Sequence, residues 1–298
     1  MIPTEQRDCV QHYRPLAQLV PAHWHTGSLE ADDGTRIHYT RTGGDKPTVL
    51  CLHGVQGNGL TWLRTARALE ATYEVILPDA RGHGLSGRVG PGLSEDVLVD
   101  DLLRLLQTLR LDHPFVIGHS LGADLAGRVA AAHPVRGVVL VDPALHNVAA
   151  TLALDPDAPP PWLQALVATL RSLAGLPHAE RMAVGLRLLP PGTPVFDEAD
   201  YVSFVDAQAQ FDLQFFRYAA RMGYLVEAPE VIAAITAPVL LLTARPLLPG
   251  ASIAPGIAQF ARHWRAGQHV HFADSGHFIM FEQFARFIAI LTRFLAEH

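Results

Sequence analysis

The sequence of 298 residues predicts an α/β fold in which a mostly parallel sheet is covered by helices on both faces. Short apolar runs alternate with amphipathic stretches from about residue 36 onward. Runs such as 48–52 and 239–243 are nearly continuous in their apolar character, which is typical of parallel strands buried on both faces. The alternation stops between about residues 143 and 237, where helical patterns follow one another without strands.

The predicted elements follow this alternation in order. Strands are expected at residues 36–42, 48–52, 73–77, 115–118, 138–141, 239–243 and 269–272. Helices that pack on these strands are expected at residues 60–71, 94–109, 121–132 and 278–295, with Ser94 capping the second of them. Three further helices are expected within the interruption, at residues 162–173, 179–189 and 198–225.

These patterns divide the chain into three parts. Residues 1–27 are predicted to form an N-terminal extension, and residues 28–142 together with 238–298 are predicted to form the α/β core. Residues 143–237 are predicted to form a helical cap inserted between two strands of the sheet. A proline-rich segment at 155–161 begins the insertion, and a second break follows at 190–192.

Composition excludes several classes of protein. Hydrophobic residues make up 49% of the chain and charged residues 17%, which suffices for a sizeable core. The net charge of −6 and the lack of any basic run argue against a nucleic-acid partner. No stretch is long enough to span a bilayer and the N-terminus lacks a signal-peptide pattern, so we expect a cytoplasmic protein with no membrane partner. The sequence leaves the oligomeric state open, with a homodimer among the options.

A candidate nucleophile, Ser120, lies in the pentapeptide Gly-His-Ser-Leu-Gly at residues 118–122. The pentapeptide follows a predicted strand and opens a predicted helix, which is the context that a G-x-S-x-G elbow requires. Glycines at 118 and 122 permit close approach of the neighbouring elements, and a sharp turn would hold the serine hydroxyl clear of the sheet. The backbone N–H of Leu121, at the start of the helix, would point to where an oxyanion forms.

Three further motifs make the resemblance to the α/β-hydrolase superfamily plain, and it extends from about residue 28 to the C-terminus. His-Gly-Val-Gln at 53–56 resembles the family's oxyanion-hole loop, which implies Val55 as the second backbone donor. Asp-Ala-Arg-Gly-His-Gly-Leu-Ser at 79–86 resembles a loop with a structural role. Ser-Gly-His-Phe at 275–278 resembles the loop that carries the catalytic histidine. All four motifs stand in the family's order.

His277 is therefore the predicted general base among 16 histidines. It follows the last predicted strand and comes after the serine, as the chain order serine–acid–histidine requires. His119 is expected to point away, because the elbow exposes one side chain, and His53 is expected to be a structural donor in its loop. The histidine pairs elsewhere lack carboxylates or cysteines in a ligand pattern, so no metal site is expected.

The acid of the triad departs from the family's usual pattern. Most members place it after the strand that follows the cap, but residues 244–250 contain neither Asp nor Glu. Asp142 is the preferred candidate, because it ends the strand after the nucleophile helix, a position that some members use. From there a carboxylate can hold the histidine tautomer. Asp274 is too close to His277 in sequence, and Asp124 on the nucleophile helix is expected to face away.

The resemblance implies acyl transfer to water through an acyl-enzyme on Ser120, with no metal or cofactor. The expected substrate is a small, uncharged and partly apolar carboxylic ester or lactone, because few charges lie in the motif loops. Gly54, Trp62 and Phe278 are the expected substrate contacts, and a minority of the cap aromatics should line an apolar pocket.

Other functions on the same fold stay open. A carbon–carbon bond hydrolase, a cofactor-free dioxygenase and a slow-turnover ligand-binding receptor all keep a serine–histidine pair. Epoxide hydrolases and haloalkane dehalogenases use an aspartate nucleophile, and Ser120 argues against them.

Overall fold

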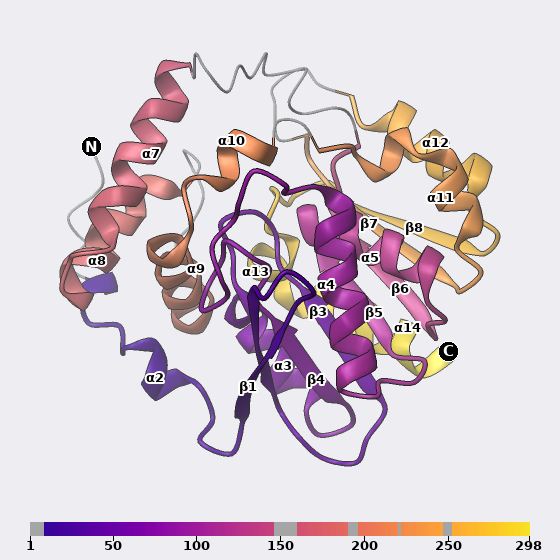
Figure 1. Ribbon diagram of the computed structural model, residues 1–298, viewed down its shortest axis with the longest axis horizontal. Coiled ribbons are helices and arrows are strands. Elements are labelled where there is room, and N and C mark those ends of the chain that lie inside the picture. Colours follow the sequence, from indigo (N-terminus) through magenta and orange to yellow (C-terminus); the bar gives the residue numbers. More distant parts are fainter. Residues whose placement is uncertain (1–8, 146–159, 190–195, 220–221, 247–251) are drawn as a thin grey trace.

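The computed structural model describes residues 9–145, 160–189, 196–219, 222–246 and 252–298, and an eight-stranded sheet runs through its centre (Figure 1). The strand order is β1-β2-β4-β3-β5-β6-β7-β8. β2 pairs antiparallel with both β1 and β4, and all other neighbours are parallel. This sheet confirms the predicted fold class. Its strands are β1 (His25–Glu30), β2 (Arg36–Arg41), β3 (Thr48–Leu52), β4 (Glu74–Pro78), β5 (Phe115–His119), β6 (Gly137–Val141), β7 (Val239–Ala244) and β8 (Gly267–Phe272).

The strands that are buried on both faces are the ones that the sequence predicts most clearly, whereas an exposed edge strand is missed. Every residue of β4, β5, β6 and β7 is buried, as their nearly continuous apolar runs require. β1 is the one strand that the sequence analysis did not predict. It is an edge strand whose side chains are mostly polar and exposed, so no apolar run marks it. The sheet therefore begins at His25, before the expected core boundary at residue 28.

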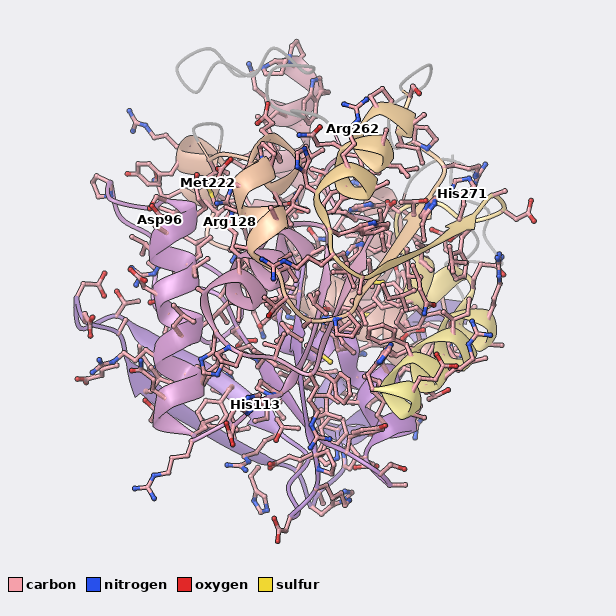
Figure 2. The ribbon with its side chains drawn as sticks, turned by 90° about the vertical axis from the view of Figure 1, so that its right-hand side faces the viewer. Asp96, His113, Arg128, Met222, Arg262 and His271 are labelled. Carbon is pink, nitrogen blue, oxygen red and sulfur yellow. The ribbon has the colours of Figure 1, made fainter. Side chains whose placement is uncertain are left out.

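Helices cover both faces of the sheet (Figure 1). α4 and α5 lie on one face, and α3 and α14 lie on the other. The Ser94 hydroxyl accepts the N–H of Val97 and caps α4, as predicted, and Figure 2 shows Asp96 in the first turn of that helix. The core helices are η1 (Gly59–Trp62), α3 (Leu63–Leu69), α4 (Glu95–Thr108), α5 (Leu121–Ala132), α12 (Ala254–His263), α13 (Ile279–Glu282) and α14 (Phe284–Glu297).

The insertion between β6 and β7 is helical in its described part. Its elements are α7 (Pro161–Leu173), α8 (His178–Gly185), η2 (Leu186–Leu188), α9 (Glu198–Gln210), α10 (Phe215–Ala219), η3 (Leu225–Glu227) and α11 (Pro229–Ala234). α11 packs on the core helices α5 and α12, so the end of the insertion is part of the core packing. Residues 155–159 and 190–192, where the sequence predicts breaks, lie outside the described residues.

The single helix expected over residues 198–225 is wrong, because the chain turns after α9. Phe211 has an extended backbone, and the N–H of Asp212 donates to the carbonyl of Gly82 in the core at 2.8 Å. The Asp212 carboxylate then accepts the N–H of Gln214 at 3.1 Å, which starts the next helical turn. A hydrogen bond to a distant loop thus ends a helix whose residues favour its continuation.

The N-terminal extension is attached to the insertion. α2 (Leu16–Leu19) packs on α9, and the guanidinium of Arg14 forms an ion pair with Glu198 at 2.6 Å. Trp24, just before β1, donates its indole N–H to Glu70 at 2.6 Å. The described part of this extension therefore contacts both the core and the insertion.

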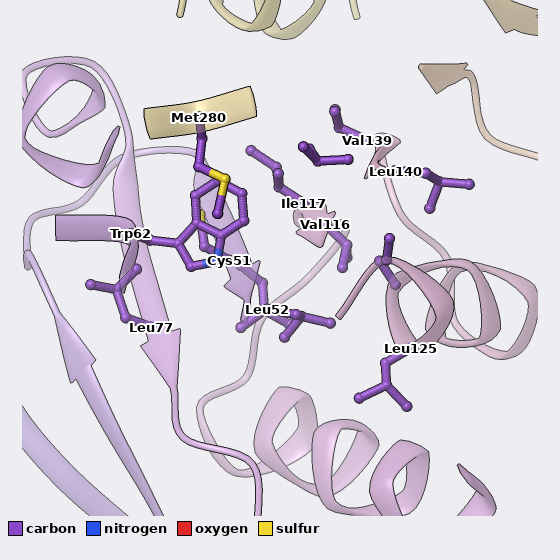
Figure 3. Close-up of a cluster of buried hydrophobic side chains, with 14 of the residues drawn as sticks. Cys51, Leu52, Trp62, Leu77, Val116, Ile117, Leu125, Val139, Leu140 and Met280 are labelled. Carbon is purple, nitrogen blue, oxygen red and sulfur yellow. The ribbon is translucent and has the colours of Figure 1, made fainter. Parts of the chain in front are cut away.

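Trp62 lies inside the hydrophobic core (Figure 3). Its side chain is completely buried near Cys51 and Met280, and its ring centroid is 6.3 Å from that of Phe287 on α14. The expectation that Trp62 contacts substrate is therefore wrong, because its side chain is enclosed by the hydrophobic core.

In the described ranges no helix is long and apolar enough to cross a bilayer.

Candidate active site

Ser120 stands in a sharp turn between β5 and α5. Its backbone angles, φ 54° and ψ −118°, lie in a region that costs about 1–3 kcal/mol for a residue with a side chain. A Cβ atom on Gly118 would clash with the carbonyl oxygen of Gly122, and one on Gly122 would clash with that of Leu52. The N–H of Ser120 donates to the carbonyl of Val141 at 3.0 Å and ties the turn to β6. These contacts produce the elbow that the pentapeptide predicts.

Two backbone N–H groups border the serine. Leu121 begins α5, and Val55 follows β3 in a tight loop in which the N–H of Gly57 donates to the carbonyl of Gly54 at 3.0 Å. A Cβ atom on Gly54 would lie 3.1 Å from the Cβ of Ser120, so this loop passes directly beside the nucleophile. Within the described part of the chain, no backbone acceptor takes the N–H of Val55 or Leu121. Both donors are therefore available to an oxyanion.

Asp142 and His277 contact each other across the end of the sheet. The Asp142 Oδ2 atom lies 2.7 Å from Nδ1 of His277, and its Oδ1 atom accepts the N–H of Ala244 at 2.9 Å. A carboxylate can only accept at Oδ2, so Nδ1 carries the proton and, in the neutral ring, Nε2 keeps a lone pair that can accept one. The side chain of Asp142 is 11% exposed and that of His277 is 19% exposed, so both are largely shielded from solvent but still partly accessible.

A carboxylate that the sequence analysis missed holds the histidine loop. Glu282 accepts the N–H of Gly276 at 2.7 Å and that of Phe278 at 3.3 Å, the residues on either side of His277. The signal available in the sequence was an acidic residue five positions after the histidine, at the end of a short helical turn. Such a signal is weak, because nothing in it shows that the side chain points back toward the loop.

His119 supports the same loop from the sheet side. Its Nε2 atom lies 2.9 Å from the carbonyl oxygen of His277, so this nitrogen carries the proton and donates. Burial lowers the pKa of His119 well below its usual range, and the neighbouring His277 lowers it further. His119 is thus a neutral structural donor that points away from the cavity side of Ser120, as the elbow argument expects.

The remaining motif residues form a buried scaffold. His53 accepts the N–H of Ala80 at Nε2 (2.9 Å) and donates from Nδ1 to the carbonyl of Gly54 (2.8 Å). Asp79 accepts the backbone N–H of Gly59 at 2.7 Å and that of Leu85 at 2.8 Å. These bonds attach the loop after β4 to the loop that carries Val55, and neither His53 nor Asp79 lines the cavity.

Ser120, Asp142 and His277 line one cavity of about 200 Å3. Most of its described wall is apolar and comes from Val55, Leu121, Leu125, Leu145, Phe215, Ala219, Met222, Tyr224, Pro246 and Ile253. The sequence analysis expected a minority of the cap aromatics to line the pocket. Phe215 and Tyr224 are the ones that do so in the described part of the insertion. Figure 2 shows Met222 and Arg128 near each other on this side of the molecule.

Phe278 does not line this cavity, contrary to the expectation. Its ring lies 5.5 Å from that of His277 but stacks on Phe281 at 5.6 Å and packs against Phe196 and Phe204. It therefore fixes the histidine from behind, as part of an aromatic cluster between the core and the insertion. Gly54 lies close to Ser120 but is likewise absent from the described cavity wall.

Asp124 lines the cavity, although the sequence analysis expected it to face away. Its carboxylate is buried and accepts backbone N–H groups from Leu225, before α11, and from Ala144, two residues after Asp142. Burial raises the pKa of Asp124 to about 7, although these bonds and nearby Arg128 oppose that shift. The carboxyl thus joins α5 to the end of β6 and to the end of the insertion.

Three charged residues besides Asp124 and Asp142 border the cavity: Glu95, Arg128 and Arg245. Glu95 accepts the N–H of Gly223 at 3.1 Å, so it faces the same chain segment as Asp124.

In the described ranges, no group of three or more His, Cys, Asp or Glu residues could hold a metal ion.

Comparisons with known proteins agree with this architecture. Residues 47–284 match the protein family described as the alpha/beta hydrolase fold. The chain is 34% identical over 120 residues to 2-(acetamidomethylene)succinate hydrolase from Mesorhizobium japonicum, which covers 40% of this chain and 43% of that protein. It is 36% identical over 121 residues to N-formylmaleamate deformylase from Pseudomonas putida, covering 39% and 44%. These matches therefore span less than half the length of either relative.

A solved structure shows the same fold over nearly the whole chain. The enol-lactonase from Burkholderia xenovorans LB400 superposes with a TM-score of 0.63 and 22% sequence identity, covering 91% of this chain and 100% of that one. The family match extends over most of the chain, from residue 47 to residue 284. The chain therefore belongs to the α/β-hydrolase fold family.

Proposed function

We propose that this protein is a serine hydrolase that cleaves a carboxylic ester or lactone of a small, partly apolar molecule. The observation that carries the proposal is the 2.7 Å contact between Asp142 and His277 at the wall of the cavity that Ser120 also lines. A buried carboxylate that fixes a histidine tautomer beside a strained serine is the arrangement that activates a weak hydroxyl nucleophile.

The proposed reaction uses two acyl-transfer steps. Ser120 attacks the substrate carbonyl while Nε2 of His277 takes its proton, and Asp142 stabilises the imidazolium that forms. The N–H groups of Val55 and Leu121 stabilise the negative charge that develops on the carbonyl oxygen. The imidazolium then protonates the leaving alcohol. Water, deprotonated by the same histidine, releases the acid and regenerates Ser120.

The apolar wall supports a substrate with a hydrocarbon part. Leu121, Leu125 and Met222 offer no hydrogen bonds, so they favour aliphatic or aromatic groups over polyols or nucleotides. The lactonase superposition shows a shared fold, and the ester or lactone class rests on the cavity chemistry and the triad.

The nucleophile is tested by covalent labelling. We expect a fluorophosphonate to add one phosphonyl group to Ser120, detected as a mass increase of the intact protein and located by peptide mapping. Ser120→Ala should abolish the adduct, whereas Ser86→Ala, which changes a structural loop serine, should keep it. An unchanged mass of the native protein after treatment would remove Ser120 from the mechanism.

A substrate panel separates the alternatives. p-Nitrophenyl esters, lactones and N-acyl amides should be offered together, because one relative is named as a deformylase of an N-formyl compound. Turnover of esters or lactones that is lost in Ser120→Ala supports the proposal. Ligand binding without turnover of any member would favour the receptor, the carbon–carbon bond hydrolase or the dioxygenase.

A further inference from the structure

Arg245 is a cation at the catalytic end of the cavity. It follows β7 directly and lines the cavity together with Ser120, Asp142 and His277. β7 is the strand after which most family members carry the triad acid, so this chain has a guanidinium where a carboxylate is usual.

The Arg245 side chain is held toward the histidine loop. Its backbone N–H donates to the carbonyl of Ser275 at 3.1 Å, and its Nε donates to the same oxygen at 3.2 Å. Two bonds to one carbonyl, two residues before His277, restrict the stem of the side chain. The two terminal nitrogens have no hydrogen-bond partner within the residues that the structure describes.

No carboxylate of the described cavity wall neutralises this guanidinium. Both oxygens of Asp142 are engaged, one by His277 and the other by the N–H of Ala244. Glu95 accepts the N–H of Gly223, and Asp124 accepts the N–H groups of Leu225 and Ala144, so each has partners other than Arg245. Across the described ranges, none of the ion pairs includes Arg245. Among the residues that the structure describes, the Arg245 guanidinium therefore has no ion-pair partner, although the Asp142 carboxylate lines the same end of the cavity.

We propose that Arg245 binds a carboxylate of the substrate, so that the preferred ester or lactone is an anion with one acidic group and an apolar body. This inference rests on the proposed function and replaces the expectation of an uncharged substrate, which considered the motif loops alone. A guanidinium pairs with a carboxylate through two parallel N–H donors, which orients the substrate as well as attracting it.

Arg245 differs from Arg128, the second arginine of the cavity wall, in the groups that surround its guanidinium. Arg128 lies one helical turn after Asp124 on α5, and its charge opposes the rise that burial causes in the pKa of Asp124. Arg128 thus has an internal carboxylate nearby, whereas the described part of the chain offers the Arg245 side chain one partner, a backbone carbonyl. The electrostatic attraction between a substrate anion and a guanidinium is strongest where no protein anion competes for that guanidinium.

The kinetic test compares matched acidic and neutral esters. Mono-p-nitrophenyl adipate and p-nitrophenyl hexanoate have acyl groups of equal length, and only the first ends in a carboxylate. For a carboxylate on the leaving group, 4-acetoxybenzoate is compared with 4-methylphenyl acetate. In at least one pair, we expect Arg245→Met to lower the acidic-to-neutral ratio of kcat/KM about tenfold, the size of one lost charged hydrogen-bonded contact.

Controls isolate the charge at this position. Arg245→Lys should keep part of the preference, because a point charge remains without the planar fork. Arg262→Met, an exposed position on α12, should leave the ratio unchanged. Raising NaCl from about 0.05 M to about 0.5 M should weaken the preference for the acidic ester in the native protein, because salt screens exposed charges. Ratios that stay within about twofold of the native value in both pairs of Arg245→Met would overturn the proposal.

A binding experiment keeps this test independent of turnover. Adipate and hexanoate are titrated calorimetrically into Ser120→Ala with and without Arg245→Met. Tighter binding of adipate that is lost in the double variant supports the anion site even if fluorophosphonate labelling rejects Ser120. Equal binding of both acids, or a preference for adipate that survives in the double variant, would overturn the anion site and leave the serine chemistry untouched.

Discussion

The C-terminal ends of β6 and β7 lie side by side in the sheet, yet they present opposite charges to the same cavity. Asp142 directly follows β6, and its carboxylate contacts His277. Arg245 directly follows β7, and its guanidinium has no anionic partner among the described residues. The parallel register brings both ends to the same edge, so position in the sheet does not decide their roles. The side chain and its hydrogen bonds decide them.

Each strand end is held by the next one along the sheet. The carboxylate at the end of β6 accepts the N–H of Ala244 at the end of β7. The residue after β7 in turn bonds twice to the carbonyl of Ser275, in the loop that follows β8. Asp142 itself has a φ of 45°, which turns its side chain out of the strand direction. Acid, cation and histidine therefore share one connected backbone frame.

The largest expected effect comes from removing the acid at the end of β6. Asp142→Asn should lower kcat about 10^3- to 10^4-fold, because an amide favours the wrong histidine tautomer. Its carbonyl can still accept the N–H of Ala244, so thermal unfolding should shift little. Steady-state kinetics and calorimetry check both parts. Activity within about tenfold of the native protein would show that the β6 acid does not serve the histidine.

An intermediate effect is expected from the loop that closes over both strand ends. Glu282→Ala leaves two N–H groups beside His277 without their acceptor, so the ring should lose its fixed position and kcat should fall about 10- to 100-fold at unchanged KM. Glu282→Gln keeps one acceptor and should recover part of the loss. Glu297→Ala, on the exposed end of α14, serves as the matched control. A loss of thermal stability without a change in kcat would contradict a positioning role.

The smallest expected effect concerns Asp124 on α5, whose carboxyl group bonds to the segment after β6, and it is measured as a pH-dependent change in unfolding free energy. Burial raises the pKa of Asp124, so the folded protein binds its proton more tightly than the unfolded chain does. The resulting stabilisation is present at low pH and is lost as pH rises toward about 7. Asp124→Asn removes that loss, so the unfolding free energy of the variant relative to the native protein should rise with pH.

Urea unfolding at pH 5, 6 and 7 measures this difference, which should be at most about 1.4 kcal/mol per pH unit. Asp200, whose pKa burial also raises to about 7, is present in both proteins and cancels in the comparison. Asp45→Asn, in an exposed turn, should show no such trend. A difference that does not vary with pH would show that Asp124 is ionised in the folded protein at every pH tested.

The sequence alone determined the fold class, because continuous apolar strands alternating with amphipathic helices leave a parallel sheet covered on both faces as the consistent arrangement. It also singled out Ser120, since glycines at 118 and 122 reveal a close backbone approach that the structure contains. These features are local: the residues that cause them are neighbours in the chain.

Only the tertiary structure decided which side of each element faces the core and which residues meet at its edge. The sequence predicted that Trp62 would contact substrate, but the core encloses its side chain. Periodicity extended one helix over residues 198–225, but the chain turns where the N–H of Asp212 donates to the carbonyl of Gly82. The position of Asp124 on the cavity wall and the bonds that direct Arg245 toward the histidine loop depend on contacts between segments far apart in the chain. Such contacts leave no periodic signal in the sequence, because each depends on the shape of the whole fold.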